Sequence, residues 1–159
     1  MQGKRNRRHG STLIEAAFVF IPLMTLILGI ADFSFAHFIR VTVQHAVREG
    51  TRYAITYQLD SGKCQDASIK AVVTAQAMGF LSSAPQQDLI KVRYYDPLTF
   101  SEILGAAGNA PGNIVEVSVE GYQYSWMAPL LFAGTPFTIT VRSSDRMEGL
   151  SSGSTPPCR

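Results

Sequence analysis

Residues 10–20 read Gly-Ser-Thr-Leu-Ile-Glu-Ala-Ala-Phe-Val-Phe, and this stretch decides the architecture of the 159-residue chain. Glu15 is the only charged residue between Ser11 and Ala31. An apolar helix of about 20 residues is long enough to span the hydrocarbon core of a bilayer. A carboxylate inside such a span is energetically costly, so its presence indicates a function and a partner for the charge.

The residues before this stretch are basic, and they predict how the span is oriented. They are Lys4, Arg5, Arg7 and Arg8, and the residues after position 10 carry 10 basic and 12 acidic groups. Basic residues next to a span stay on the cytoplasmic side. We therefore predict a cytoplasmic leader over residues 1–10, one membrane span, and a domain outside. The nearly balanced remainder gives no reason to expect a nucleic-acid partner.

The spacing of Gly10 and Glu15 resembles that of the type IV pilin superfamily, whose precursors are cut after a glycine and carry a glutamate at the fifth mature position. Two further segments look like TadE-like pseudopilins of the tight-adherence (Tad) pilus. They are Gly29-Ile30-Ala31-Asp32-Phe33 and Ala46-Val47-Arg48-Glu49-Gly50-Thr51-Arg52-Tyr53-Ala54. The resemblance covers about residues 8 to 57, and it is only generic beyond them.

The resemblance implies that a membrane prepilin peptidase cuts the chain between Gly10 and Ser11. Glycine suits this position because it lets the backbone enter a narrow cleft in an extended conformation. Cleavage would give Ser11 an α-amino group that is mostly cationic at neutral pH. In the superfamily the glutamate of an incoming subunit pairs with this amine on a neighbour, so Glu15 would be the assembly carboxylate.

Three alternatives concern the same segment. The first is an uncleaved membrane anchor. The second is a secretory signal peptide, because Gly29 and Ala31 are small residues at suitable spacing, although Glu15 inside the apolar region argues against it. The third is a Glu15 side chain that reaches back to the cytoplasmic interface.

The resemblance implies a minor pilin-like (pseudopilin) subunit in the assembly or initiation of a Tad-type type IV pilus used in adhesion. "Minor" rests on length, since major Tad pilins are much shorter. The implied location is the bacterial inner membrane, with the domain in the periplasm or in the extracellular pilus. The implied partners are the membrane, the prepilin peptidase, other pilins and pseudopilins, and the Tad assembly machinery. The alternative function is an uncleaved, membrane-anchored periplasmic binding or scaffold module.

The sequence contains no pattern that is typical of an enzyme. It has no nucleophile elbow, no paired-cysteine motif and no phosphate-binding glycine loop. His9, His37 and His45 share no metal-like spacing with carboxylates or cysteines. We therefore expect no catalytic residue, metal, cofactor or small-molecule substrate.

The pattern predicts one long helix from Ser11 to about Tyr57, apolar over residues 11–31 and amphipathic over 32–57. Gly50 weakens a helix by about 1 kcal/mol relative to alanine, so the helix is expected to end there or at residues 60–62.

Two residues of this helix are expected to have particular roles. Pro22 removes a backbone donor and is predicted to kink or loosen the helix, which would let a subunit bend from bilayer to filament. The alternative is an ordinary transmembrane proline. Asp32 is expected to mark the outer boundary of the span as an interfacial residue.

Residues 58–148 are predicted to form a small α+β domain, followed by a tail over 149–159. Asp66 is expected to cap a second helix that runs to about Leu81. Three alternating segments predict an antiparallel sheet of three or four strands. They are residues 90–94, 115–119 and 137–141.

The middle strand contains a change of phase that predicts a bulge. Apolar positions alternate up to Val119, whereas the aromatic residues after Gly121 fall in the opposite phase. These aromatic residues are Tyr122, Tyr124 and Trp126. We expect them to form the core of the sheet, with an exposed partner-binding patch as the alternative. Residues 105–113 and 143–159 are expected to be loops or tail.

Cys64 and Cys158 are the only cysteines. A domain outside the inner membrane meets an oxidising compartment, so a disulfide between them is expected. In the chain-entropy model such a bridge stabilises by roughly 4 to 5 kcal/mol. The alternative is two free thiols, with Cys158 on a flexible tail.

Overall fold

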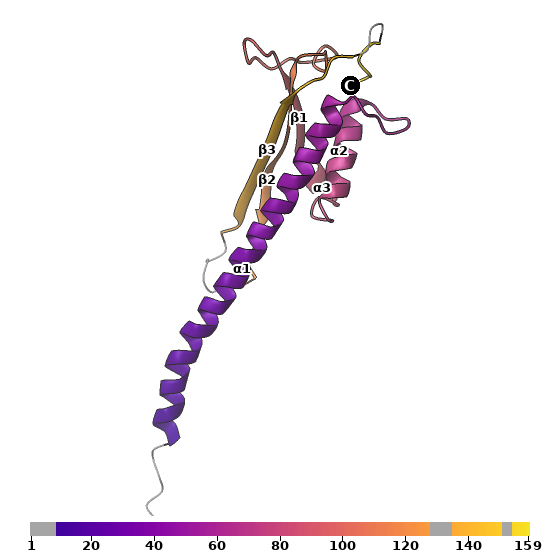
Figure 1. Ribbon diagram of the computed structural model, residues 1–159. Coiled ribbons are helices and arrows are strands. Elements are labelled where there is room, and N and C mark those ends of the chain that lie inside the picture. Colours follow the sequence, from indigo (N-terminus) through magenta and orange to yellow (C-terminus); the bar gives the residue numbers. More distant parts are fainter. Residues whose placement is uncertain (1–8, 128–134, 151–153) are drawn as a thin grey trace, which may run out of the picture.

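The computed structural model describes residues 9–127, 135–150 and 154–159, with side chains described from residue 13 onward. One long helix, α1 (His9–Ile55), carries a small domain on its C-terminal half (Figure 1). The other elements are α2 (Gln65–Gln76), α3 (Ala84–Gln87), β1 (Ile90–Tyr95), β2 (Ile114–Tyr124) and β3 (Phe137–Arg146). The predicted α+β class is confirmed, with a long N-terminal helix, further helices and a three-stranded antiparallel sheet.

Helix α1 has 47 residues and passes through both Pro22 and Gly50 without ending. It stops at Ile55, and Tyr57 just beyond it has a φ of 53°. The predicted end near Tyr57 was therefore close, and the predicted break at Gly50 was wrong. Packing of the C-terminal half against the domain explains this, because buried contacts outweigh the modest helix penalty of one glycine.

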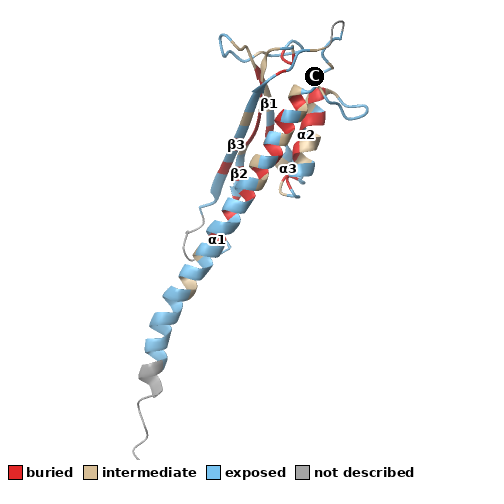
Figure 2. Cartoon of the chain, in the orientation of Figure 1, coloured by how far each residue is buried: buried red, intermediate tan, exposed pale blue. Residues whose placement is uncertain are grey.

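The C-terminal half of α1 buries one apolar stripe against the domain. Its buried apolar residues are Ala36, Ile39, Val43, Ala46, Val47 and Ala54. The spacing of three and four residues places these side chains on one face of the helix. That face packs against α2 on one side and against β2 and β3 on the other. Burial is confined to this half of the helix (Figure 2).

Gly50 allows α1 and α2 to approach each other closely. A Cβ atom at this position would overlap Cγ2 of Val73 and contact Ile69 Cγ2 at 3.6 Å. Val73 and Ile69 are both fully buried on α2, so neither can move freely. The glycine is thus required by packing rather than by its backbone conformation.

We expect Gly50→Ala to lower the free energy of unfolding by roughly 1 to 2 kcal/mol, because overpacking outweighs the gain in helix propensity. Thermal unfolding of the full chain in detergent, followed by circular dichroism, measures this change. Val73→Ala in the same chain should recover part of the loss, since it removes the overlapping methyl group. Gly149→Ala is the matched control, because no atom lies within 4 Å of its Cβ position. Equal stability of Gly50→Ala and the parent chain would contradict the packing argument.

Helix α2 differs from its prediction at both ends. Its N-cap is Cys64, and Asp66 lies in the first turn, so the predicted Asp66 cap was wrong. The helix stops at Gln76 instead of Leu81 because Met78 and Gly79 have φ values of 50° and 89°. These left-handed conformations cannot continue a helix. The apolar residues Ile69, Val73 and Ala77, spaced by four residues, are buried.

The sheet has the order β1-β2-β3, with both pairs antiparallel. The β2·β3 register shifts between Val119 and Tyr122, and Gly121 has a φ of 78°. The predicted bulge is therefore confirmed. Because of it, buried positions continue in the opposite phase at Tyr122 and Tyr124. Both tyrosines belong to the core, so the exposed-patch alternative was wrong for these two residues.

Strand β3 and the C-terminal residues are more ordered than expected. Strand β3 continues to Arg146, so the prediction of loop from Ser143 onward was wrong for residues 143–146. Its last four residues pair with residues 114–117 of β2. The sequence did not predict this pairing, because residues 143–146 are polar and show no strand pattern. Met147 after the strand is buried.

The end of the chain lies against the start of α2. Cys64 and Cys158 form a disulfide with Cα atoms 4.9 Å apart, and the Cys158 carbonyl accepts a bond of 2.7 Å from the Gln65 N–H. Arg159 donates from Nε to Asp66 at 3.0 Å, and its guanidinium lies 4.5 Å from the Tyr94 ring centroid. Burial, followed by the Asp66 carboxylate, raises the pKa of Tyr94. These contacts fix the terminal residues to the domain.

Candidate membrane helix and its junction with the domain

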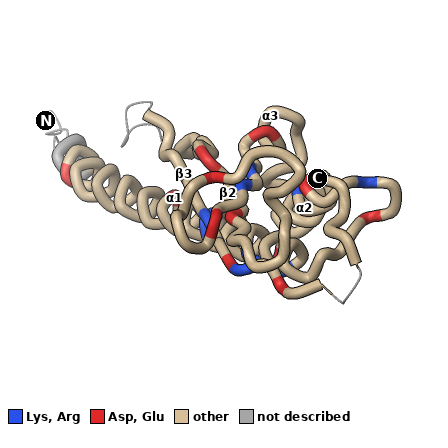
Figure 3. The backbone as a smooth tube through the Cα atoms, turned by 90° about the horizontal axis from the view of Figure 1, so that it is seen from above, with Lys and Arg blue, Asp and Glu red and all other residues tan. Residues whose placement is uncertain are grey.

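The N-terminal half of α1 projects from the domain with its apolar side chains exposed. Leu13, Phe18 and Val19 keep 73%, 76% and 70% of their surface. Large exposed side chains of this kind are normally buried by another protein or by lipid. Among the described residues, one helix, α1, is long and apolar enough to cross a membrane. Charged residues gather on the domain and leave the projecting half almost uncharged (Figure 3).

The predicted assembly residues lie at the free end of this helix. Gly10 and Ser11 are in its first turn, and Glu15 follows one turn later with an exposed side chain. Positions 11 and 15 are about 6 Å apart along the helix axis. Pro22 lies inside the continuous helix, and its predicted role as a flexible point stays a prediction. The basic leader residues Lys4, Arg5, Arg7 and Arg8 lie outside the described residues.

Asp32 connects the projecting helix to the domain. Its side chain is 1% exposed, and Oδ1 accepts hydrogen bonds from the Tyr124 hydroxyl at 2.8 Å and from the Met127 N–H at 2.9 Å. The end of β2 therefore covers this carboxylate, and the prediction that Asp32 marks the outer boundary of the span stays a prediction. Burial, helped by the bond to Asp32, raises the pKa of Tyr124 to about 12. Asp32 thus fixes the end of β2 to the point where α1 leaves the domain.

We expect Asp32→Ala to lower the free energy of unfolding by roughly 2 to 3 kcal/mol, because it leaves the buried Tyr124 hydroxyl without its acceptor. Asp32→Asn is the matched variant, since its amide oxygen can still accept, and its effect should be smaller. Thermal unfolding followed by circular dichroism gives both values. An unchanged free energy of unfolding in Asp32→Ala would show that this junction contributes nothing to stability.

The two histidines with described side chains lie on an exposed basic face of α1. His37, Arg40, His45 and Arg48 line one groove together with Arg142 of β3. The described residues contain no group of three or more His, Cys, Asp or Glu that could hold a metal ion. The side chain of His9 lies outside the described part of the chain.

The fold and this helix together define a class of protein: a small α+β domain carried on a single long apolar helix that could serve as a membrane anchor. The family model for TadE-like protein matches residues 10–52. Over this segment α1 is similar to the TadE-like family. The matched segment ends within α1, before the domain's other elements begin. Neither the search of curated proteins nor the search of solved structures gave a match.

Proposed function

We propose that this chain is a minor pseudopilin that helps to assemble or initiate a Tad-type type IV pilus, and that it acts as a structural subunit rather than an enzyme. The observation that carries the proposal is the exposed apolar half of α1, which lies within the TadE-like match and contains Glu15 as its one charged residue. A bare apolar helix needs lipid or other helices around it, and a pilin uses both in turn.

Processing between Gly10 and Ser11 would supply a cationic partner for Glu15 on a neighbouring subunit. The new α-amino group would be cationic, and pairing it with a carboxylate relieves the penalty that hydrocarbon imposes on each charge. Since the two positions are about one helical turn apart, an incoming helix offset by about 6 Å along its axis brings its Glu15 level with the Ser11 amine of its neighbour. The pair would therefore set both the order and the axial register of docking.

The uncleaved anchor is the competing function, and the N-terminus of the mature protein separates the two. Purification from cells that assemble the pilus, followed by N-terminal sequencing, should give a start at Ser11. A start at Met1 would favour a membrane-anchored binding or scaffold module. A start at Asp32 would mean that the apolar half of α1 is removed and the domain is released.

A further inference from the structure

Six aromatic side chains form a continuous series of ring contacts at the base of the domain. This aromatic collar consists of Phe35, Phe38, Phe80, Tyr124, Trp126 and Phe137. Neighbouring ring centroids in the series lie between 5.7 and 6.4 Å apart. Such distances are typical of favourable aromatic pairs.

The collar draws its members from four parts of the chain that meet at one end of the domain. Helix α1 provides two rings, the turn after α2 provides Phe80, and the adjacent ends of β2 and β3 provide the others. This end of the domain faces the projecting half of α1 (Figure 1). The collar therefore lies at the place where the apolar helix leaves the domain.

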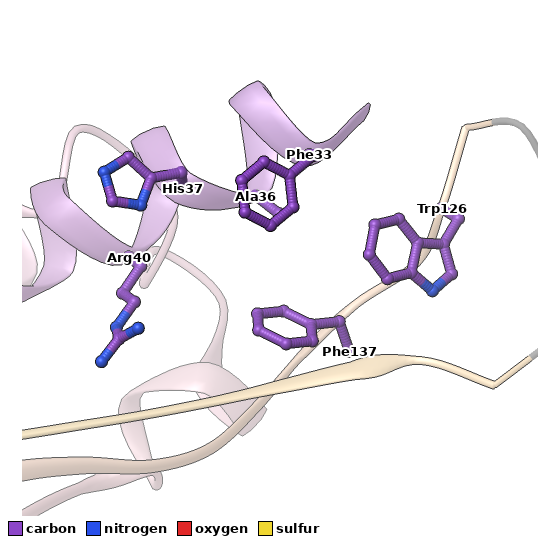
Figure 4. A pocket seen from close by; sticks show the side chains of 6 residues that line it. All are labelled: Phe33, Ala36, His37, Arg40, Trp126 and Phe137. Carbon is purple, nitrogen blue, oxygen red and sulfur yellow. The ribbon is translucent and has the colours of Figure 1, made fainter. Parts of the chain in front are cut away.

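The collar is too exposed to be only a core. Phe35, Phe38 and Phe137 keep 40%, 46% and 40% of their surface. Phe33 beside them is 68% exposed, and it lines a small cavity with Trp126 and Phe137 (Figure 4). These rings are half packed on the protein and half available to another apolar phase.

The position of the collar along α1 matches the edge of a bilayer. From Leu13 to Ala31 the helix rises about 27 Å, close to the roughly 30 Å hydrocarbon core. Phe35 lies about 6 Å beyond Ala31, within a headgroup layer that is about 5 to 7 Å thick. By the same rise, Phe38 lies about 10 Å beyond Ala31, so the collar begins in the headgroup layer and extends to its outer edge.

Polar groups within and above the collar suit the same layer. The Trp126 Nε1–H donates to the Thr135 carbonyl at 2.9 Å, so this ring has an apolar body and a polar edge. His37 and Arg40 line the same cavity as Trp126, on the side away from the apolar span (Figure 4). The long Arg40 side chain can reach lipid phosphates with its guanidinium from the solvent side of the collar. Tryptophan and tyrosine rings concentrate at membrane interfaces because they combine an apolar ring with a polar group.

We propose that the aromatic collar lies in the headgroup layer of the outer leaflet. There it fixes how deeply the helix is inserted and holds the domain against the membrane surface. This inference rests on the proposed function, in which the apolar half of α1 lies in a membrane. Lipid is the occupant because the collar is continuous with the apolar span and begins where that span reaches bilayer length.

Trp126 is the only tryptophan of the chain and reports directly on this contact. The full chain is reconstituted into phosphatidylcholine vesicles that contain lipids brominated either near the headgroup or deep in the acyl chain. We expect shallow bromines to remove about half of the Trp126 emission and deep bromines to remove several-fold less. The matched control combines Trp126→Phe with Leu104→Trp, which moves the tryptophan to an exposed loop at the opposite end of β2. This control should keep its emission with either lipid.

Three outcomes would overturn the proposal. Emission unaffected by both lipids, in a protein that resists carbonate extraction, would show that the domain is held away from the bilayer while the anchor stands. Stronger quenching by deep than by shallow bromines would place Trp126 inside the hydrocarbon core. Release of the protein by carbonate would remove the anchor itself, and the proposed function would fail together with the collar.

Discussion

Glu15→Leu is expected to leave processing and membrane insertion intact and to reduce incorporation into sheared pili by at least about tenfold. The change removes the one charge from the projecting half of α1, so insertion into the bilayer becomes easier. It also leaves the Ser11 amine of the neighbouring subunit without its carboxylate. An unpaired buried charge costs about 3 to 5 kcal/mol, which is more than a tenfold change in occupancy requires.

Immunoblots of membrane and pilus shear fractions measure this outcome in cells that assemble the filament. Glu15→Asp is the matched control, because it keeps a carboxylate at nearly the same depth, and it should retain most incorporation. Normal amounts of Glu15→Leu in the shear fraction would contradict the pairing of Glu15 with the Ser11 amine. A variant that remains in the membrane but never reaches the pilus supports it.

Removal of the Cys64–Cys158 disulfide is expected to lower the free energy of unfolding by roughly 4 kcal/mol. The bridge joins residues 94 positions apart and encloses the whole sheet, so its loss frees a long segment of the unfolded chain. The double substitution Cys64→Ala and Cys158→Ala tests this without the risk of mispaired thiols. Thermal unfolding in detergent, with and without reductant, gives the size of the change.

The contacts of the chain end provide a control for the disulfide. Arg159→Gln removes the ion pair with Asp66 and the contact with the Tyr94 ring but keeps the bridge. Partly buried contacts of this kind are worth only about 1 to 2 kcal/mol. Equal losses for Arg159→Gln and for the double cysteine variant would show that the docked end, not the covalent link, is responsible for stability.

The sequence was most informative where a local pattern and the tertiary contacts agree. The apolar run through Ala31 predicts a helix in any environment, and the amphipathic spacing beyond it selects the face that packs on the domain. The phase change at Gly121 predicted the bulge because strand residues alternate faces, so a shift in the apolar pattern requires an extra residue.

The sequence was least informative where a residue is defined by a distant partner. Gly50 looks like a helix breaker, and only the closeness of Val73 on α2 shows why it is tolerated. Asp32 looks like an exposed residue at the end of a span, but Tyr124, 92 positions away, covers this carboxylate and donates a hydrogen bond to it. Asp66 looks like a helix cap, yet its carboxylate binds Tyr94 and Arg159.

The same distinction between local patterns and distant partners holds for the candidate site. Gly10, Ser11 and Glu15 could be selected from a short motif because their spacing on one helix is local. The aromatic collar could not, since its rings come from separate segments that only the fold brings together. Tyr122, Tyr124 and Trp126 drew attention in the sequence, but Phe35 and Phe80 had no signal that related them to these residues.

The mass of the mature N-terminus tests the central claim most directly, because the pairing of Glu15 requires a newly formed amine. Intact protein purified from the membrane of piliated cells should begin at Ser11, and the peptide containing Gly10 should be absent. The account is contradicted if that protein still begins at Met1 while the prepilin peptidase of the same cells is active.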